Sequence, residues 1–172
     1  DLPDVVDPTF GLIDDLLITA EGTALGGGTL GQAGFTQQRN DADMLPYLGL
    51  MEFDTGFLAG STPLELRDVI IHEMGHVIGF TDFLWNQKGL IDYNNAIFTG
   101  VTATAEHNAL FGLNDAGVPV QTGVGPGSDF AHWDDALYGD ELMTFSATGT
   151  APRRITRVTA GMFQDLGYVV DL

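Results

Sequence analysis

Hydrophobic residues in the first half of the chain fall into short runs separated by glycine-rich turns. Residues 15–20 have the apolar pattern of a buried strand. Residues 29–35 predict a short strand whose glycines suit an edge position, where another backbone can approach closely. Residues 49–54 predict a third strand. We therefore expect the first half of the chain to be rich in β-structure until a helix begins.

A long helix is predicted directly after the third strand. Thr62 is placed to cap its N-terminus, Pro63 suits the first helical position, and Glu65 completes a capping box. Apolar residues then recur at helical spacing, at Leu66, Val69, Ile70, Met74, Val77 and Ile78. Gly79 favours a left-handed conformation that ends a helix, so the helix is expected over about residues 63–78.

The pattern after this helix is looser. Residues 80–131 contain scattered apolar residues and turn-forming sequences such as residues 123–127. An irregular stretch of this length is usually functional or contains small elements of its own. A second helix is predicted over residues 156–166, where Val158, Met162, Phe163 and Leu166 recur at helical spacing and Gly167 can end it.

A strong chemical motif lies inside the first predicted helix. His72, Glu73, Met74, Gly75 and His76 form the pattern H-E-x-x-H. Two histidines four residues apart lie on one face of a helix, so both imidazoles can reach one metal ion at about 2.0–2.1 Å. Glu73 lies beside the first of these ligands, where its carboxylate can polarise a water molecule. The alternative, a solvated helical face carrying these residues by chance, is less favoured because the chain has only 4 histidines.

Composition limits the class of protein. The 172 residues with 44% hydrophobic content suit one α+β domain with a real core, divided into an N-terminal subdomain (1–79) and a C-terminal subdomain (80–172). There is no cysteine, so disulfides and thiolate zinc sites are excluded. A net charge of −18 argues against nucleic acid and anionic membranes as partners, and it makes calcium a weaker second expectation beside zinc. No apolar run spans a bilayer, and no signal-peptide pattern begins at Asp1.

A catalytic zinc normally has three protein ligands and one position open to water, so a third ligand is needed. Asp82 is the near candidate, because it follows His76 at a spacing at which some zinc peptidases place their third ligand. The distant candidates are His107 and His132. His107 lies in a polar stretch, and we interpret it as a surface or supporting residue. The residues alone do not decide between Asp82 and His132.

The chain resembles the leishmanolysin branch of the metzincin peptidases, in its cysteine-free bacterial form. The resemblance spans most of the chain in the family's order and rests on residues 28–34, 49–54, 72–80, 132–133, 141–144 and 165–168. It implies a metzincin-like zinc peptidase fold. That fold has a small mixed twisted sheet, an active-site helix above the cleft, and an irregular C-terminal subdomain that ends in a helix.

The same resemblance implies a set of site residues. Residues 80–131 correspond to the family's insertion before the third histidine, so His132 becomes the preferred third ligand and Asp82 the alternative. Met143 corresponds to the methionine of the Met-turn, beneath the metal ligands. Some metzincins have a tyrosine two residues later, but Phe145 stands there, so no tyrosine switch is expected.

The resemblance also indicates that an N-terminal layer is missing. Metzincin catalytic domains usually begin with a strand and a helix ahead of the strand that we predict at residues 15–20. Residues 1–14 are too short to supply both. We therefore expect either a second polypeptide carrying that layer or self-association of this chain through the uncovered sheet. The other interpretation is that residues 1–14 fold back and cover enough of the sheet.

These observations together predict a secreted or cell-surface zinc metalloendopeptidase. Glu73 would take the proton of the attacking water, and the protein or peptide substrate would pair with the strand at Gly31, Gln32, Ala33 and Gly34. An ordinary edge strand is the other interpretation of those four residues. The rival functions are a zinc hydrolase with a non-protein substrate and a catalytically silent adhesion or binding module, against which the intact Glu73 argues.

Overall fold

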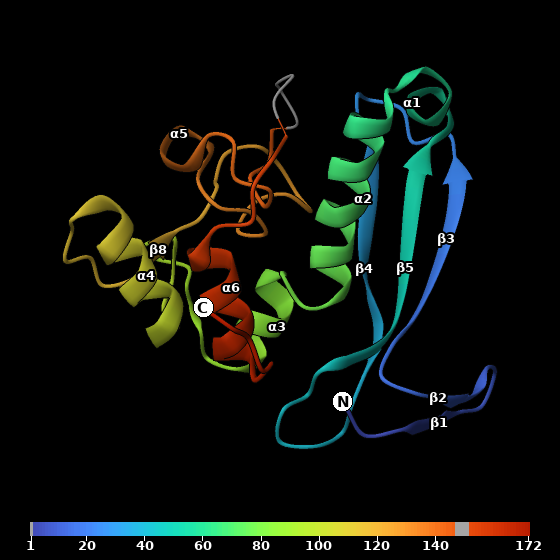
Figure 1. Cartoon of the computed structure of the whole chain (residues 1–172), viewed down its shortest axis with the longest axis horizontal. Helices are drawn as coiled ribbons and strands as arrows, with labels where there is room; N and C mark the ends of the chain where they lie inside the picture. Colours follow the sequence, from blue (N-terminus) through green and yellow to red (C-terminus); the bar gives the residue numbers. More distant parts are fainter. Residues whose placement is uncertain (1, 147–151) are drawn as a thin grey trace. The chain divides into compact units, whose positions relative to one another are not determined.

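The computed structural model describes residues 2–146 and 152–172 and divides into two units, Asp1–Gly79 and Phe80–Leu172. The first unit contains β1 (Val5–Asp7), β2 (Gly11–Ile13), β3 (Leu17–Thr23), β4 (Gly31–Gln38), β5 (Pro46–Asp54), α1 (Thr55–Gly60) and α2 (Pro63–Val77), as Figure 1 shows. The second contains α3 (Asp82–Gln87), β6 (Ile91–Asp92), β7 (Ile97–Phe98), α4 (Val101–Phe111), β8 (Val118–Pro119), α5 (Asp135–Tyr138) and α6 (Arg157–Leu166). The α+β class is confirmed.

The main sheet of the first unit has the strand order β3-β5-β4. β3 runs parallel to β5, and β4 runs antiparallel to it. The three predicted strands are confirmed with shifted bounds: β3 and β4 begin and end later than predicted, and β5 begins earlier. β4 is at an edge of this sheet, as its glycines indicated. The short antiparallel hairpin of β1 and β2 was not predicted.

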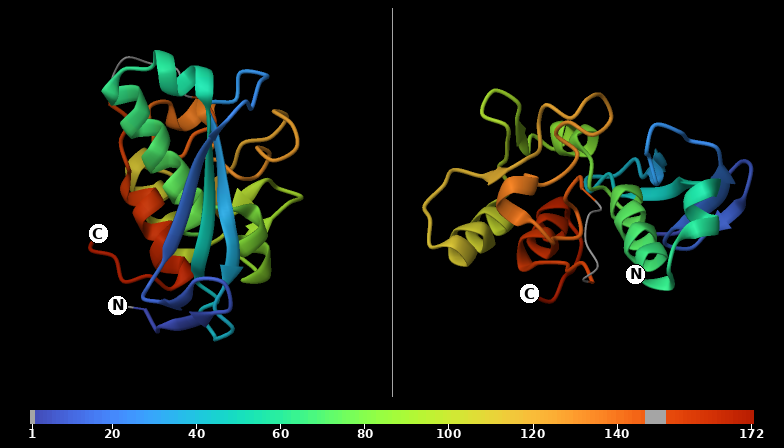
Figure 2. Two further views of the ribbon diagram at one scale, coloured as in Figure 1. Left: turned by 90° about the vertical axis from the view of Figure 1, so that its right-hand side faces the viewer. Right: turned by 90° about the horizontal axis from the view of Figure 1, so that it is seen from above.

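Helix α2 lies along one face of this sheet (Figures 1 and 2). Its predicted capping box is present, and Gly79 has the expected positive φ of 115°. The core between helix and sheet is formed by Met51, Phe53, Val69 and Val77. A Cβ built on Gly49 would lie 2.3 Å from Val77 Cγ1, so only glycine permits this close packing of helix on strand.

The predicted apolar face of α2 was too broad. Ile70 and Met74 are 36% and 40% exposed, whereas Val69 and Val77 are buried. A helix that packs on one face of a sheet buries only one stripe of its surface, and the neighbouring apolar positions stay at its margin.

The second unit has an aromatic core beside a pair of helices. The rings of Trp85 and Trp133 stack with their centroids 5.7 Å apart, and Phe80 and Phe98 pack edge-on against them. Helices α4 and α6 lie side by side, as both figures of the fold show. Gly161 permits this approach, because a Cβ there would lie 3.1 Å from the backbone nitrogen of Ala103.

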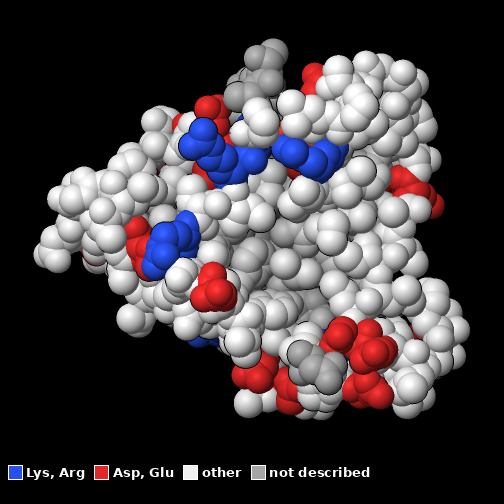
Figure 3. All heavy atoms as spheres, in the orientation of Figure 1, with Lys and Arg blue, Asp and Glu red and all other residues white. Residues whose placement is uncertain are grey.

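Acidic side chains gather over the hairpin end of the first unit (Figure 3). The charge of Asp15, followed by a hydrogen bond with Asp4, raises the pKa of Asp14. Within residues 2–146 and 152–172, no group of three acidic side chains could hold a metal ion, so the calcium expectation gains no support. No helix in the described residues is long and apolar enough to cross a bilayer.

Candidate metal centre

Helix α2 brings His72 and His76 together in the first unit. Their Nε2 atoms are 3.0 Å apart, and the two rings meet edge to face with centroids separated by 4.7 Å. Two ligand atoms of one tetrahedral zinc ion, each about 2.0–2.1 Å from the metal, would be roughly 3.3 Å apart. The pair therefore has the geometry that the spacing of four residues predicted. His76 is buried and His72 is half-buried.

Glu73 lies on the same helix, with its carboxylate against strand β4. Its side chain is buried, and a Cβ built on Gly31 would lie only 2.7 Å from Glu73 Oε1. Burial raises the pKa of Glu73 to about 8. The missing side chain of Gly31 thus provides the space that the carboxylate occupies beside the edge strand.

His132 belongs to the second unit and is fixed by hydrogen bonds at both its backbone and its ring. The peptide nitrogen of Gln121 donates to the His132 carbonyl oxygen at 2.8 Å. His132 Nδ1 is 3.0 Å from the carbonyl oxygen of Ser128. A carbonyl can only accept, so Nδ1 carries the proton and Nε2 carries the lone pair that a metal would use. The side chain of this histidine is buried.

Met143 is also in the second unit, and its backbone is hydrogen-bonded to the segment that carries His132. The peptide nitrogen of Trp133 donates to the Met143 carbonyl oxygen at 3.0 Å, and Met143 is 1% exposed. Phe145 meets the His132 ring edge to face at a centroid distance of 5.7 Å. The predicted role of Met143 beneath the metal ligands stays a prediction.

Asp82 begins helix α3 in the second unit. Its carboxylate accepts a hydrogen bond from the hydroxyl of Tyr93 at 3.2 Å. Desolvation and then the charge of Asp82 raise the pKa of that tyrosine. The carboxylate therefore has a hydrogen-bond partner within the second unit, and its role as the alternative ligand stays a prediction.

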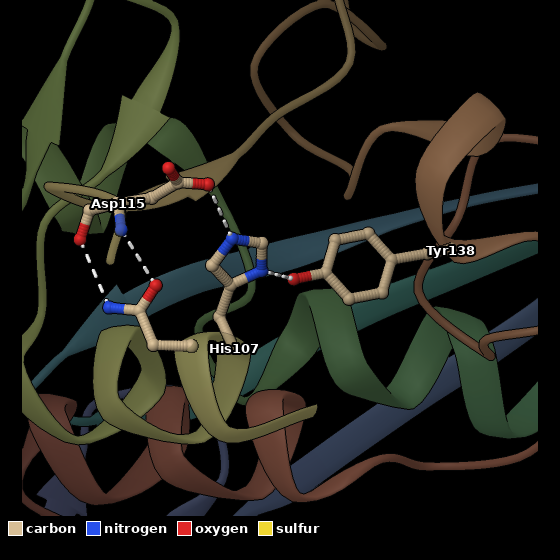
Figure 4. Close-up of polar contacts among 4 residues, drawn as sticks. His107, Asp115 and Tyr138 are labelled. Atoms are coloured by element: carbon tan, nitrogen blue, oxygen red, sulfur yellow. Dashed lines mark hydrogen bonds and ion pairs between the residues drawn. The ribbon is translucent and has the colours of Figure 1, made fainter. Parts of the chain in front are cut away.

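His107 is not the surface residue that its polar neighbourhood suggested. Its ring is 0% exposed, and it joins two partners within the second unit (Figure 4). Nε2 lies 3.1 Å from Asp115 Oδ2, and Nδ1 lies 2.6 Å from the hydroxyl of Tyr138. Burial, followed by the nearby acidic charges, raises the pKa of Tyr138. A helix-borne histidine in a polar sequence was buried because Tyr138, 31 residues away, packs over it.

Comparison with known proteins adds to this geometry. The sequence model of the leishmanolysin family, peptidase family M8, matches residues 32–172, which is most of the chain. The chain belongs to the leishmanolysin family. Membership indicates a metallopeptidase, and it confirms the resemblance found in the sequence. No curated protein matches the chain.

The residues at hand fit the metal on which the leishmanolysin family depends. That metal is zinc, and imidazole nitrogens are among its preferred ligands. The chain offers no thiolate, and His72 and His76 present two nitrogens at the spacing of a shared ion. Glu73 follows His72 directly on the same helix. The two histidines can therefore bind a metal ion, and the adjacent carboxyl group of Glu73 can accept or donate a proton.

Proposed function

We propose that this chain is a secreted or cell-surface zinc endopeptidase whose metal is held by His72, His76 and His132. The carrying observation is the α2 pair, with its Nε2 atoms 3.0 Å apart beside the buried Glu73, in a chain of a metallopeptidase family. A set of three histidine ligands suits a catalytic zinc ion that keeps one position open to water. His132 is preferred to Asp82 because its Nδ1 proton is bound by a carbonyl, which orients Nε2 for coordination.

Glu73 acts in this proposal as the general base and then as the general acid. Zinc bound by the histidines would polarise the substrate carbonyl and lower the pKa of a water molecule. Glu73 accepts one proton from the water molecule while the water oxygen attacks the peptide carbonyl carbon. The same carboxyl group then delivers the proton to the amine nitrogen as the carbon–nitrogen bond breaks. Burial beside Gly31 holds the carboxylate in one place for both transfers.

The substrate strand of this proposal is β4, at Gly31, Gln32, Ala33 and Gly34. β4 is an edge strand of its sheet, and Gly31 lies directly against the carboxylate of Glu73. An extended peptide added to that edge would run beside the general base. This proximity favours the functional interpretation over an ordinary edge strand.

We test the mechanism with Glu73→Gln. Glutamine keeps the size of the side chain but cannot accept the water's proton, so kcat on a fluorogenic peptide should fall by roughly 10²–10⁴-fold. Zinc content, measured by atomic absorption, should not change. Glu21→Gln is the matched control, because Glu21 is exposed on β3 of the same unit. Turnover near that of the wild type in zinc-loaded Glu73→Gln would contradict the role, and loss of zinc would show that Glu73 supports the metal instead.

The rival substrates and the expected partner have separate tests. A peptide-library assay distinguishes an endopeptidase from a zinc hydrolase with a non-protein substrate, and activity that depends on Glu73 excludes a silent binding module. A second polypeptide or self-association stays a prediction, based on β3 as the other edge of the sheet. Light scattering and intact mass measurement test it, and a monomer of this chain alone would contradict it.

A further inference from the structure

A buried carboxylate joins two segments of the second unit. Glu141 is 2% exposed. Its Oε2 accepts a hydrogen bond from the peptide nitrogen of Met143. Its Oε1 accepts from the peptide nitrogen of Thr156 at 3.1 Å and from the hydroxyl of Thr159. Burial raises the pKa of Glu141, and these donors oppose the effect. The carboxylate therefore ties the turn around Met143 to the first turn of α6.

Thr159 closes this network onto the residue after His132. Its hydroxyl donates to Glu141 and accepts a hydrogen bond from Trp133 Nε1 at 2.8 Å. The peptide nitrogen of Trp133 donates to the Met143 carbonyl oxygen. Trp133, Met143 and Thr159 are each at most 1% exposed. The closed loop of bonds thus runs from Glu141 through Thr159, Trp133 and Met143 back to Glu141.

We propose that Glu141 and Thr159 are positioning residues for the ligand His132. The proposal rests on the proposed function, because it gives the network a purpose only if His132 binds zinc. Trp133 is held at its ring by Thr159 and at its peptide nitrogen by the Met143 turn. His132 precedes it directly, so these two bonds fix the backbone from which the His132 side chain extends, while the Ser128 carbonyl orients its ring.

Stability alone is a weak account of this network. A buried carboxylate loses its hydration, and a well-packed apolar group of similar size often stabilises a core as well or better. Trp133 already packs against Trp85, Phe80 and Phe98 without its indole N–H. The directional bonds add a fixed orientation of the segment 132–133, which is what a metal ligand needs.

The test compares Thr159→Val with Thr159→Ser in the full chain. Valine keeps the shape but removes the hydroxyl, whereas serine keeps the hydroxyl. Zinc affinity, measured by competition with a chromophoric chelator, should weaken by roughly 10- to 100-fold in Thr159→Val and return towards the wild-type value in Thr159→Ser. The visible absorption of the cobalt-substituted protein reports ligand geometry, and it should change in the valine variant alone.

Two further variants separate positioning from folding. Asp165→Ala removes the carboxylate that accepts from Thr102 and Ala103 at the start of α4, so it should lower the melting temperature without changing zinc affinity. Glu141→Gln serves if Thr159→Val does not fold, because an amide nitrogen cannot accept from Met143, and it should weaken zinc binding in the same way. If the valine variant has a lower melting temperature but keeps the zinc affinity and the cobalt spectrum of the wild type, the positioning role is overturned.

His132→Ala distinguishes failure of this inference from failure of the proposed function. A changed cobalt spectrum in His132→Ala with an unchanged one in Thr159→Val and Glu141→Gln would overturn only the positioning role. An unchanged spectrum in His132→Ala would overturn the ligand assignment, and the inference with it.

Discussion

Single residues decide the geometry of the candidate base, and Gly31 is the clearest case. We predict that Gly31→Ala lowers kcat/KM by about 10- to 100-fold, because the new Cβ would meet Glu73 Oε1 at 2.7 Å and Cγ at 3.0 Å. β4 is fixed by its ladder with β5, so the carboxylate has to move. Gly60→Ala is the control, since its Cβ would meet nothing within 4 Å. Peptidase kinetics that are equal in the two variants would contradict the prediction.

The sequence indicates the candidate ligands more directly than it indicates the space around them. His72, Glu73 and His76 are recognisable because their spacing is local and the helix converts it directly into proximity. Gly31 lies 42 residues before Glu73 in the chain, and no local pattern indicates such a contact. The network of Glu141 and Thr159 was missed for the same reason, although residues 141–144 stood out in the family resemblance.

At the scale of elements, the helices differ in whether the residues that cap their ends are close to them in sequence. Helix α2 was predicted because Thr62, Glu65 and Gly79 are all next to it in sequence. Helix α4 was not predicted, because its N-cap Gly100 makes no side-chain hydrogen bond. Its first turn is capped instead by Asp165 on α6, more than 60 residues later. A cap supplied through tertiary structure is invisible to local patterns.

This distant cap gives a prediction for stability. Asp165→Ala should lower the free energy of unfolding by about 1–2 kcal/mol, because the peptide nitrogens of Thr102 and Ala103 lose an acceptor at 2.9 Å. Urea denaturation followed by circular dichroism measures the change. Gln164→Ala replaces the exposed neighbour on the same helix and should have little effect. Equal stability of the two variants would show that Asp165 does not cap α4.

At the scale of the molecule, the sequence predicted the class of fold but not its connections. Strands, the motif helix and the final helix follow from local patterns, whereas the order β3-β5-β4 depends on which strands meet after the turns. The apolar runs of β3 and β5 look alike in sequence, and nothing local shows that they pair in parallel. Residues 80–131 contain α3, α4 and three strands of two residues each. Strands of two residues are too short to produce a periodic pattern.

Metal removal tests the whole molecule, because the proposed ligands come from both units of the chain. A ligand that binds only the folded state at 100 times its Kd adds about 2.7 kcal/mol to stability. For a chain of 172 residues this corresponds to a fall in melting temperature of roughly 5–10 °C after chelation. Calorimetry should show this fall in melting temperature, and a peptidase assay of the same sample should show loss of activity.

The choice of metal added back makes the experiment decisive. Zinc should restore both the melting temperature and the activity, because three imidazoles suit zinc and the described residues hold no acidic ligand group for calcium. His132→Ala should show a much smaller shift on chelation, since two histidines hold the ion far more weakly than three. Restoration by calcium and not by zinc would contradict the histidine site. A full shift in His132→Ala would instead return the third position to Asp82, whose carboxylate would then have to leave Tyr93 to reach the metal.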